Sequence, residues 1–246
     1  MMNGYIWNPK VKGSGLITCI PQRGGCPNGC SDCFFNSGRS YLEPLDKNTP
    51  QIPTAAMATG RIVRMNDGND SNNERSFVEA VADSFTDKFF NTAIPDRLGE
   101  FPGPVVLTVN PGKITDTDFH KLDSIPENLM FVRVRVNAWN WKLVDHAVDF
   151  YTGTGWADRP VPVILTYMAY YTDEIPKEYK HKYEWKQRTT NSYWCLQQDE
   201  IRKIEFRHAD NPLVYSCGYK GTYDCSRCGH CVREYHNTME RMRKEL

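Results

Sequence analysis

Short apolar runs alternate along the chain with longer segments of mixed polarity, a pattern typical of α/β proteins. The predicted strands, each bounded by Gly, Pro or polar turn residues, are 15–20, 61–65, 104–109, 129–136, 161–167 and 213–216. Apolar residues at helical spacing predict helices at 77–85, 116–122, 141–151 and 197–208. Strands separated by helix-length segments predict parallel β/α units. Five or six such units fit a barrel or partial barrel, with the working site at the carboxyl ends of the strands.

Composition narrows the class of protein. Of the 246 residues, 40% are hydrophobic and 24% are charged, which excludes wholesale disorder. The 30 Lys and Arg residues balance the 30 Asp and Glu residues, so the net charge gives no electrostatic case for a polyanionic partner. No apolar run is long enough to span a bilayer, and the N-terminal residues lack the pattern of a signal peptide. We therefore expect a cytoplasmic protein with no membrane partner.

The nine cysteines are clustered rather than scattered. Three lie at positions 26, 30 and 33 and four at positions 217, 225, 228 and 231, whereas Cys19 and Cys195 stand alone and are predicted to be structural. An odd total and a reducing compartment disfavour a disulfide framework. Clustered thiols inside a cell are more often metal ligands, so two metal centres are predicted, one near each end of the sequence.

The first group, Cys26, Cys30 and Cys33, lies in a Gly-rich loop directly after the predicted strand 15–20. Three thiolates can hold three irons of a [4Fe–4S] cube and leave the fourth iron open to another ligand. This Cys-x3-Cys-x2-Cys loop after the first strand of a β/α series resembles the signature of the radical SAM (AdoMet radical) superfamily. The resemblance implies a partial (β/α)6 barrel of radical SAM type over residues 1–216. It also implies S-adenosylmethionine at the open iron and an electron donor such as flavodoxin or ferredoxin.

The same resemblance places S-adenosylmethionine beside polar residues that follow the second, fourth and fifth predicted strands. The implied contacts are Asn66, Asp67, Asp70, Arg133, Arg135, Asn137 and Tyr167. The family commonly has an aromatic residue just before the third cysteine, where this chain has Asp32, so Phe34 is a substitute candidate for packing on the adenine. From the residues alone, the two aspartates would serve equally as helix caps and the two arginines as solvated or cross-strand charges.

The second group consists of Cys217, Cys225, Cys228 and Cys231, within a C-terminal extension predicted to span 217–246. Its Cys-x2-Cys-x2-Cys run resembles half of a bacterial ferredoxin ligand run, which favours a second [4Fe–4S] cluster. Four thiolates are also the ligand set of a structural zinc site, which remains the alternative. His230, inside this run, is predicted to be a surface residue.

Residues 167–194 interleave aromatic and basic side chains. They are predicted to form an amphipathic cover for the barrel or a lid that contacts substrate. The predicted function is that of a radical SAM enzyme: reductive cleavage of S-adenosylmethionine gives a 5′-deoxyadenosyl radical, which abstracts hydrogen from a substrate. A peptide or protein substrate is favoured, and a nucleoside, nucleotide or nucleic acid is the alternative. A non-catalytic zinc or iron–sulfur module is the alternative of another class.

Overall fold

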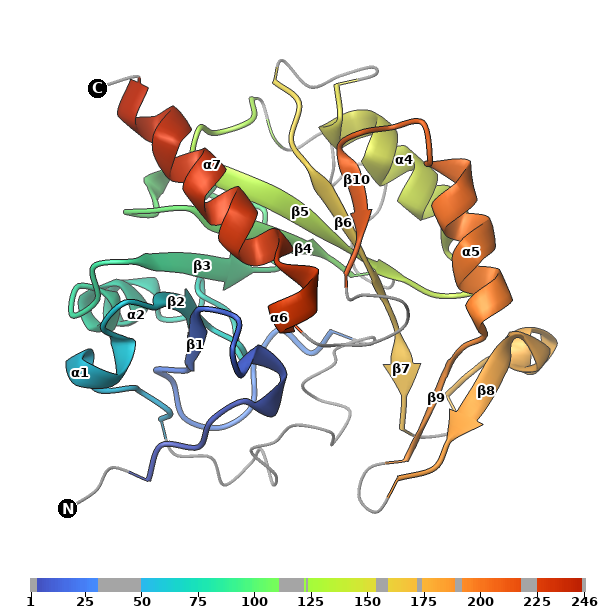
Figure 1. Ribbon diagram of the computed structural model, residues 1–246, viewed down its shortest axis with the longest axis horizontal. Helices are drawn as coiled ribbons and strands as arrows, with labels where there is room; N and C mark the ends of the chain where they lie inside the picture. Colours follow the sequence, from blue (N-terminus) through green and yellow to red (C-terminus); the bar gives the residue numbers. More distant parts are fainter. Residues whose placement is uncertain are drawn as a thin grey trace.

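A seven-stranded parallel sheet forms the centre of the protein (Figure 1). The computed structural model describes residues 4–30, 50–110, 122, 124–153, 159–171, 174–188, 192–217 and 225–244. The strands of the sheet are β1 (Leu16–Cys19), β2 (Ile62–Met65), β3 (Lys88–Thr92), β4 (Val105–Val109), β5 (Leu129–Val136), β6 (Val163–Tyr167) and β10 (Val214–Ser216). The α/β class predicted from the sequence is therefore confirmed.

Each strand of this sheet pairs in parallel with the next one along the chain, in the order β1-β2-β3-β4-β5-β6-β10. The order never reverses, so the sheet has no topological switch point of the doubly wound kind. A sequential parallel order is compatible with a partial α/β barrel. It also brings the carboxyl ends of all seven strands to one edge, which we call the carboxyl edge.

Six of the seven strands coincide with predicted ones, and β3 was not predicted. The expected five or six strands are thus corrected to seven. Strand β3 escaped notice because it begins with Lys88 and ends with Asn91 and Thr92, which leaves only two adjacent phenylalanines as an apolar signal.

Helices form where helical spacing of apolar residues predicted them. They are α2 (Arg75–Ala82), α4 (Trp141–Tyr151) and α5 (Gln198–Arg207). The predicted helix 116–122 lies outside the described residues except for its last residue. The shorter described elements are η1 (Pro9–Val11), α1 (Ala55–Ala58), η3 (Leu98–Glu100), η4 (Lys177–Lys182) and α6 (Cys225–Cys228). Over the described ranges, no helix combines the length and apolar character needed to cross a membrane.

The two faces of the sheet bury different cores. On one face, which we call the outer face, α2 and α4 pack on alternate strand residues such as Val63, Leu107 and Val134. On the other, which we call the inner face, a smaller core joins residues of β1 to β6. Because successive strand residues point to opposite faces, each strand supplies both cores.

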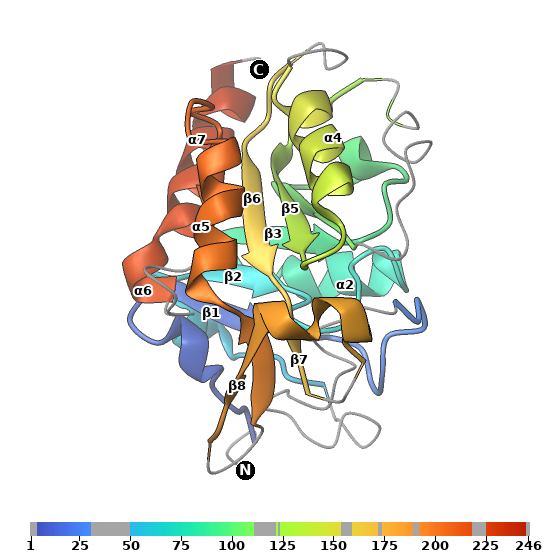
Figure 2. The same ribbon diagram turned by 90° about the vertical axis from the view of Figure 1, so that its right-hand side faces the viewer.

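Helix α7 (His230–Lys244) covers the inner face and lies across β5 (Figures 1 and 2). Tyr235 is 2% exposed within the inner core, and its hydroxyl donates to the Asp87 carboxylate at 3.0 Å. Arg241 donates from Nη2 to the carbonyl oxygens of Glu127 and Leu129 at 2.9 and 3.0 Å. The C-terminal segment is therefore packed on the sheet as part of the described fold.

The aromatic and basic segment forms a separate antiparallel sheet in the order β7-β9-β8, built from β7 (Ala169–Tyr170), β8 (Tyr183–Lys186) and β9 (Tyr193–Leu196). On one side, Tyr170 and Tyr183 pack around Trp139 next to the outer core. On the other side, Tyr193 and Cys195 are buried against Ala169. The described part of this segment thus forms a small sheet with the helical turn η4, a secondary structure that the sequence analysis did not predict.

We predict that Tyr235→Ala lowers the free energy of unfolding by about 3–5 kcal/mol, as expected for truncating a buried aromatic side chain. Urea unfolding of the full chain measures this change. His236→Ala, at an exposed neighbouring position of the same helix, is the control and is expected to have little effect. Equal, small effects of the two substitutions would contradict the assignment of α7 to the core.

Candidate metal and cofactor site at the carboxyl edge

Gln22 joins the loop after β1 to the loop after β2. Its side chain is 3% exposed, and its Nε2 donates to the carbonyl oxygens of Asp70 and Asn73 at 3.0 and 2.8 Å. Its Oε1 accepts from Asn66 Nδ2 at 2.7 Å. A single buried amide therefore fixes the relative positions of these two loops at the carboxyl edge.

Besides Gln22, further hydrogen bonds attach the cysteine loop to the loop after β2. Cys26 and Cys30 are half-buried, and Cys26 Sγ accepts a hydrogen bond from Asn73 Nδ2 at 3.5 Å. Asn28, between the two cysteines, accepts from Asn73 at 3.0 Å and donates to Asp70 at 3.1 Å. Gly29 has a φ of 54°, a left-handed conformation that glycine adopts at little cost. Cys33 and Phe34 lie outside the described residues.

Asp70 organises this loop with its carboxylate. The side chain is 3% exposed and accepts from Thr92 Oγ1 and the Ala93 amide, both at 2.6 Å, as well as from the Asn72 amide and Asn28. Burial raises the pKa of Asp70, and these hydrogen bonds oppose the rise. The carboxylate is thus engaged by four donors of the protein itself.

The neighbouring candidates Asn66 and Asp67 are engaged as well. Asn66 accepts from Ser71 Oγ at 2.9 Å and donates to Gln22, and its φ is 55°. Asp67 accepts hydrogen bonds from Asn8 and from Arg64. The structure therefore brings Asn66 and Asp70 together beside the cysteine loop, whereas Asp67 pairs with Asn8 and Arg64. The side chains of all three candidates have partners within the fold.

The candidates on β5 and β6 divide between the two faces. Arg133 points to the inner face and donates to Asn91 Oδ1 at 3.2 Å, whereas Tyr167 lies in the outer core and shares a hydrogen bond of 3.0 Å with Ser216. Asn137 is fully buried after β5, where its Oδ1 accepts from the amides of Trp139 and Asn140. Its Nδ2 has no partner among the described residues. A buried, unpaired donor at the carboxyl end of a strand suits an acceptor atom of a ligand.

A polar rim that the sequence analysis missed lies on the inner face. On each strand an apolar core residue is followed two positions later, on the same face, by a polar or sulfur-bearing one. The pairs are Leu16/Thr18, Ile62/Arg64, Phe89/Asn91, Val106/Thr108, Phe131/Arg133, Ile164/Thr166 and Tyr215/Cys217. Arg135 continues this series on β5 in register with Thr166. The repeated step from apolar to polar is visible in the sequence once the strands are aligned.

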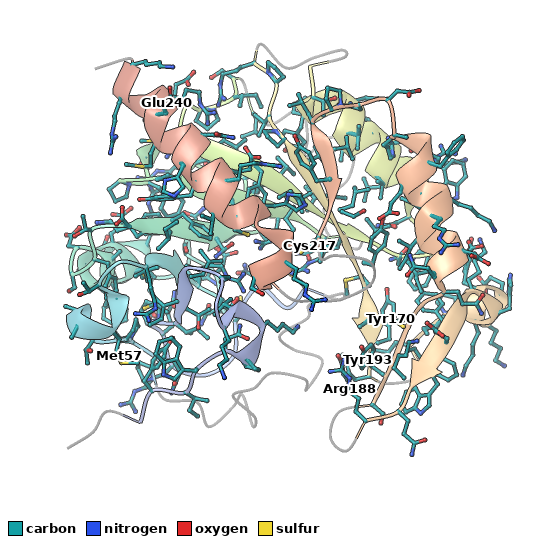
Figure 3. All side chains as sticks on the ribbon, viewed as in Figure 1. Met57, Tyr170, Arg188, Tyr193, Cys217 and Glu240 are labelled. Atoms are coloured by element: carbon teal, nitrogen blue, oxygen red, sulfur yellow. The ribbon has the colours of Figure 1, made fainter. Side chains whose placement is uncertain are left out.

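The C-terminal cysteines lie against this rim. Cys217 directly follows β10, and its amide donates to the Leu165 carbonyl at 2.7 Å (Figure 3). Cys225, Cys228 and Cys231 come from α6 and the start of α7. The thiols of Cys217 and Cys228 are hydrogen-bonded to each other. Sequence positions that are far apart thus supply thiols to one region of the inner face.

Arginines of the rim face these thiols. Arg133 hydrogen-bonds to Cys231, and burial raises the pKa of this thiol while Arg133 and Arg64 oppose the rise. Burial likewise raises the pKa of Cys225 to about 11, against the opposing effect of Arg64. The thiol–thiol hydrogen bond and burial raise the pKa of Cys217. Burial therefore raises the pKa of three of these thiols, those of Cys217, Cys225 and Cys231.

His230 departs from the expected surface position. Its ring stacks on Tyr215 with centroids 5.1 Å apart, and Nδ1 is buried without a hydrogen-bond partner in the described part of the chain. Within the same part, no three His, Cys, Asp or Glu side chains are arranged to hold a metal ion. Both metal centres therefore remain predictions.

Comparison of the chain with protein-family models, with curated proteins and with solved structures finds no match in any of the three. The geometry at the carboxyl edge is accordingly the basis for a functional hypothesis.

We predict that Asp70→Asn lowers the free energy of unfolding of the metal-free protein by about 3 kcal/mol. The reason is that the new NH2 group is a donor and would face an N–H or O–H donor that now bonds to the carboxylate. Urea unfolding measures this, with Asp96→Asn at an exposed position as the matched control. Unchanged stability together with weaker binding of S-adenosylmethionine would instead assign the carboxylate to the ligand.

Proposed function

We propose that this protein is a radical SAM enzyme whose first metal centre is a [4Fe–4S] cluster held by Cys26, Cys30 and Cys33. The observation that carries the proposal is the position of the cysteine loop. It directly follows β1 of a sequentially ordered parallel sheet and is hydrogen-bonded to the polar loop after β2. Active sites of β/α barrels lie at this carboxyl edge, which supports a working site there.

The donor set suits the group that it would hold. Three thiolates are the cluster ligands that leave one iron open, and the left-handed Gly29 lets the loop bend tightly between the cysteines. When bound, cluster and S-adenosylmethionine would together supply the 5′-deoxyadenosyl radical for hydrogen abstraction. The chain's own contribution is to hold the loop in place through Gln22 and Asn73.

The contacts assigned to S-adenosylmethionine follow from which polar atoms the fold leaves available. Asp70 and Asp67 are used within the loop, so we assign them to positioning the loop. Asn137 Nδ2 is the candidate donor to the ligand, because it is buried and unpaired within the described residues. Arg133 and Arg135 supply positive charge on the inner face near the same edge.

We propose a second metal centre at Cys217, Cys225, Cys228 and Cys231, with a [4Fe–4S] cluster favoured over zinc. The support is that four thiols, one directly after β10 and three from α6 and α7, share one region of the inner face, and that two of them form a hydrogen bond. The described side chains are not arranged as a closed metal site, so loading requires the thiols to approach further. Full ligation by four thiolates would suit electron transfer or structure.

The proposed substrate is a peptide or protein, and an external donor such as flavodoxin or ferredoxin would supply the electron. One observation favours the alternative of a nucleoside, nucleotide or nucleic acid. On the small sheet, Tyr171 and Tyr193 have ring centroids 5.4 Å apart, and the guanidinium of Arg188 lies 5.0 Å from the Tyr193 ring (Figure 3). Neighbouring aromatic rings beside a cation are the side-chain types that bind a base and a phosphate.

Anaerobic iron–sulfur reconstitution tests the proposal. We predict about eight irons per chain, as in two four-iron cubes, with S-adenosylmethionine binding and dithionite-dependent formation of 5′-deoxyadenosine. A content of about four irons plus one zinc per chain would be consistent with the proposed enzyme activity and would exclude the second iron–sulfur cluster. If the protein neither binds nor cleaves S-adenosylmethionine, the proposed enzyme activity is refuted. The non-catalytic metal-binding module then remains.

Two cysteine variants separate the centres. Cys30→Ala is expected to abolish 5′-deoxyadenosine formation, because the cube loses one of three ligands, whereas Cys228→Ala should leave the spectrum of the first cluster intact. Cys195→Ala, on the small sheet away from both groups, is the matched control and is expected to retain cleavage. Activity of Cys30→Ala equal to that of the control would contradict the ligand assignment.

A further inference from the structure

Two arginines project from the same face of strand β5. Arg133 and Arg135 alternate with Val132, Val134 and Val136 of the outer core, so both lie on the inner face, with Cα atoms about 7 Å apart along the strand. Both residues are half-buried. Two positive charges at this distance repel each other, and burial removes part of their hydration. The pair is therefore stabilised by an anion or by acceptor groups on the inner face.

The described carboxylates of the protein do not neutralise Arg133. Its Nη1 donates to Asn91 Oδ1 at 3.2 Å, which is a neutral acceptor, and no ion pair joins it to a carboxylate among the described residues. Two acidic residues of elements that border the inner face have cationic partners of their own, namely Asp67 with Arg64 and Glu234 with Arg233. The guanidinium group of Arg133 is therefore suited to an anion from outside the chain.

Thr166 on β6 adds a hydroxyl group beside these arginines. It is the register partner of Arg135 in the parallel pair of β5 and β6, and its neighbours Leu165 and Tyr167 belong to the outer core. Its side chain therefore lies on the inner face next to Arg135. Thr166 is 7% exposed, and its Oγ1 has no hydrogen-bond partner in the described part of the chain. A buried hydroxyl group of this kind suits an acceptor atom of a ligand.

S-adenosylmethionine does not supply the charge that these residues require. Its methionine part carries a carboxylate and an ammonium group, and its sulfonium adds a positive charge, so the molecule is a net cation. A further anion is needed to compensate two guanidinium groups, and the other molecule at the carboxyl edge is the substrate. Guanidinium groups bind carboxylates through paired N–H···O hydrogen bonds. A peptide offers such carboxylates on Asp, on Glu and at its C-terminus.

We propose that Arg133, Arg135 and Thr166 form a subsite on the inner face that binds a carboxylate of the peptide substrate, with the two guanidinium groups and the hydroxyl group as donors. The inference rests on the proposed function for its choice of a peptide, and it deepens that function by naming an acidic group as the feature that is recognised. It assigns the positive charge of the two arginines to the substrate, whereas Asn137 stays the candidate donor to S-adenosylmethionine.

The test measures carboxylate binding by the full chain without metal, so that it does not depend on cleavage of S-adenosylmethionine. Nuclear magnetic resonance of protein labelled with ¹⁵N-arginine follows the Nε–H signals, and those of Arg133 and Arg135 are assigned from their loss in Arg133→Lys and Arg135→Lys. The probe is N-acetyl-glutamate N-methylamide, which presents a glutamate side chain as in a peptide. The glutamine analogue, of the same shape and without charge, is the control ligand.

We expect both arginine signals to shift with the glutamate probe and to stay in place with the glutamine analogue. Thr166→Val, which keeps the shape of the side chain, should weaken binding of the probe by about 10-fold, as for the loss of one hydrogen bond. It should not lower the free energy of unfolding, because Oγ1 has no partner among the described residues.

Thr152→Val is the matched control, at a second buried threonine away from β5 and β6. Its hydroxyl donates to the Val148 carbonyl at 2.7 Å and hydrogen-bonds to Asn211 Nδ2 at 3.1 Å. This substitution should therefore lower the free energy of unfolding and leave binding of the probe unchanged. The two threonine variants thus separate an effect on the ligand from an effect on the fold.

Three outcomes would overturn the proposal. The first is the absence of shifts with the glutamate probe, or equal shifts with the glutamine analogue. The second is a response to inorganic phosphate or to S-adenosylmethionine in place of the probe, which would assign the arginines to a nucleotide or to the cofactor. The third is equal binding of the probe by Thr166→Val and Thr152→Val. Formation of 5′-deoxyadenosine is measured separately on the reconstituted enzyme, so failure of the subsite and failure of the proposed function are distinguishable.

Discussion

The parallel register of the seven-stranded sheet is the constraint on which the rest of the structure depends. Since every strand runs in the same direction and pairs with its neighbour in sequence, the polar residue that ends each apolar run reaches one rim on the inner face. Helix α7 covers the apolar part of that face, and the C-terminal cysteines lie against its polar part. The loops after β1 and β2 then meet at the carboxyl edge, where Gln22 holds them together.

The same arrangement links the two cysteine groups through one strand. Arg64 lies on β2 and faces Cys225, while the loop that follows β2 holds Asn28 and contacts Cys26. A buried polar group destabilises the fold unless it has a hydrogen-bond partner. Most of the described polar groups at the carboxyl edge have one. Among the described residues, Asn137 Nδ2 is one buried donor that has no partner, and it points to a ligand. Stability and the proposed chemistry therefore rely on the same network of side chains.

The sequence was sufficient for the elements that carry strong local patterns. Six strands and three helices follow from short apolar runs and helical spacing. Strand β3 was missed because its apolar signal is two residues long, and α7 was missed because few large apolar residues, among them Val232, Tyr235 and Met239, mark its buried side. The role of Asp70 was inaccessible for a related reason, since its partners Thr92 and Ala93 end and follow the unpredicted strand. Long-range contacts decide such roles, and no local motif encodes them.

The central claim is that an iron of the first cluster binds S-adenosylmethionine directly. The most direct measurement is the electron paramagnetic resonance spectrum of the dithionite-reduced protein, recorded with and without S-adenosylmethionine, with the four C-terminal cysteines replaced by alanine. We predict the signal of a single reduced [4Fe–4S] cluster whose g values shift when S-adenosylmethionine is added. A cluster signal that S-adenosylmethionine leaves unchanged, or no cluster signal in a folded protein, would contradict the account.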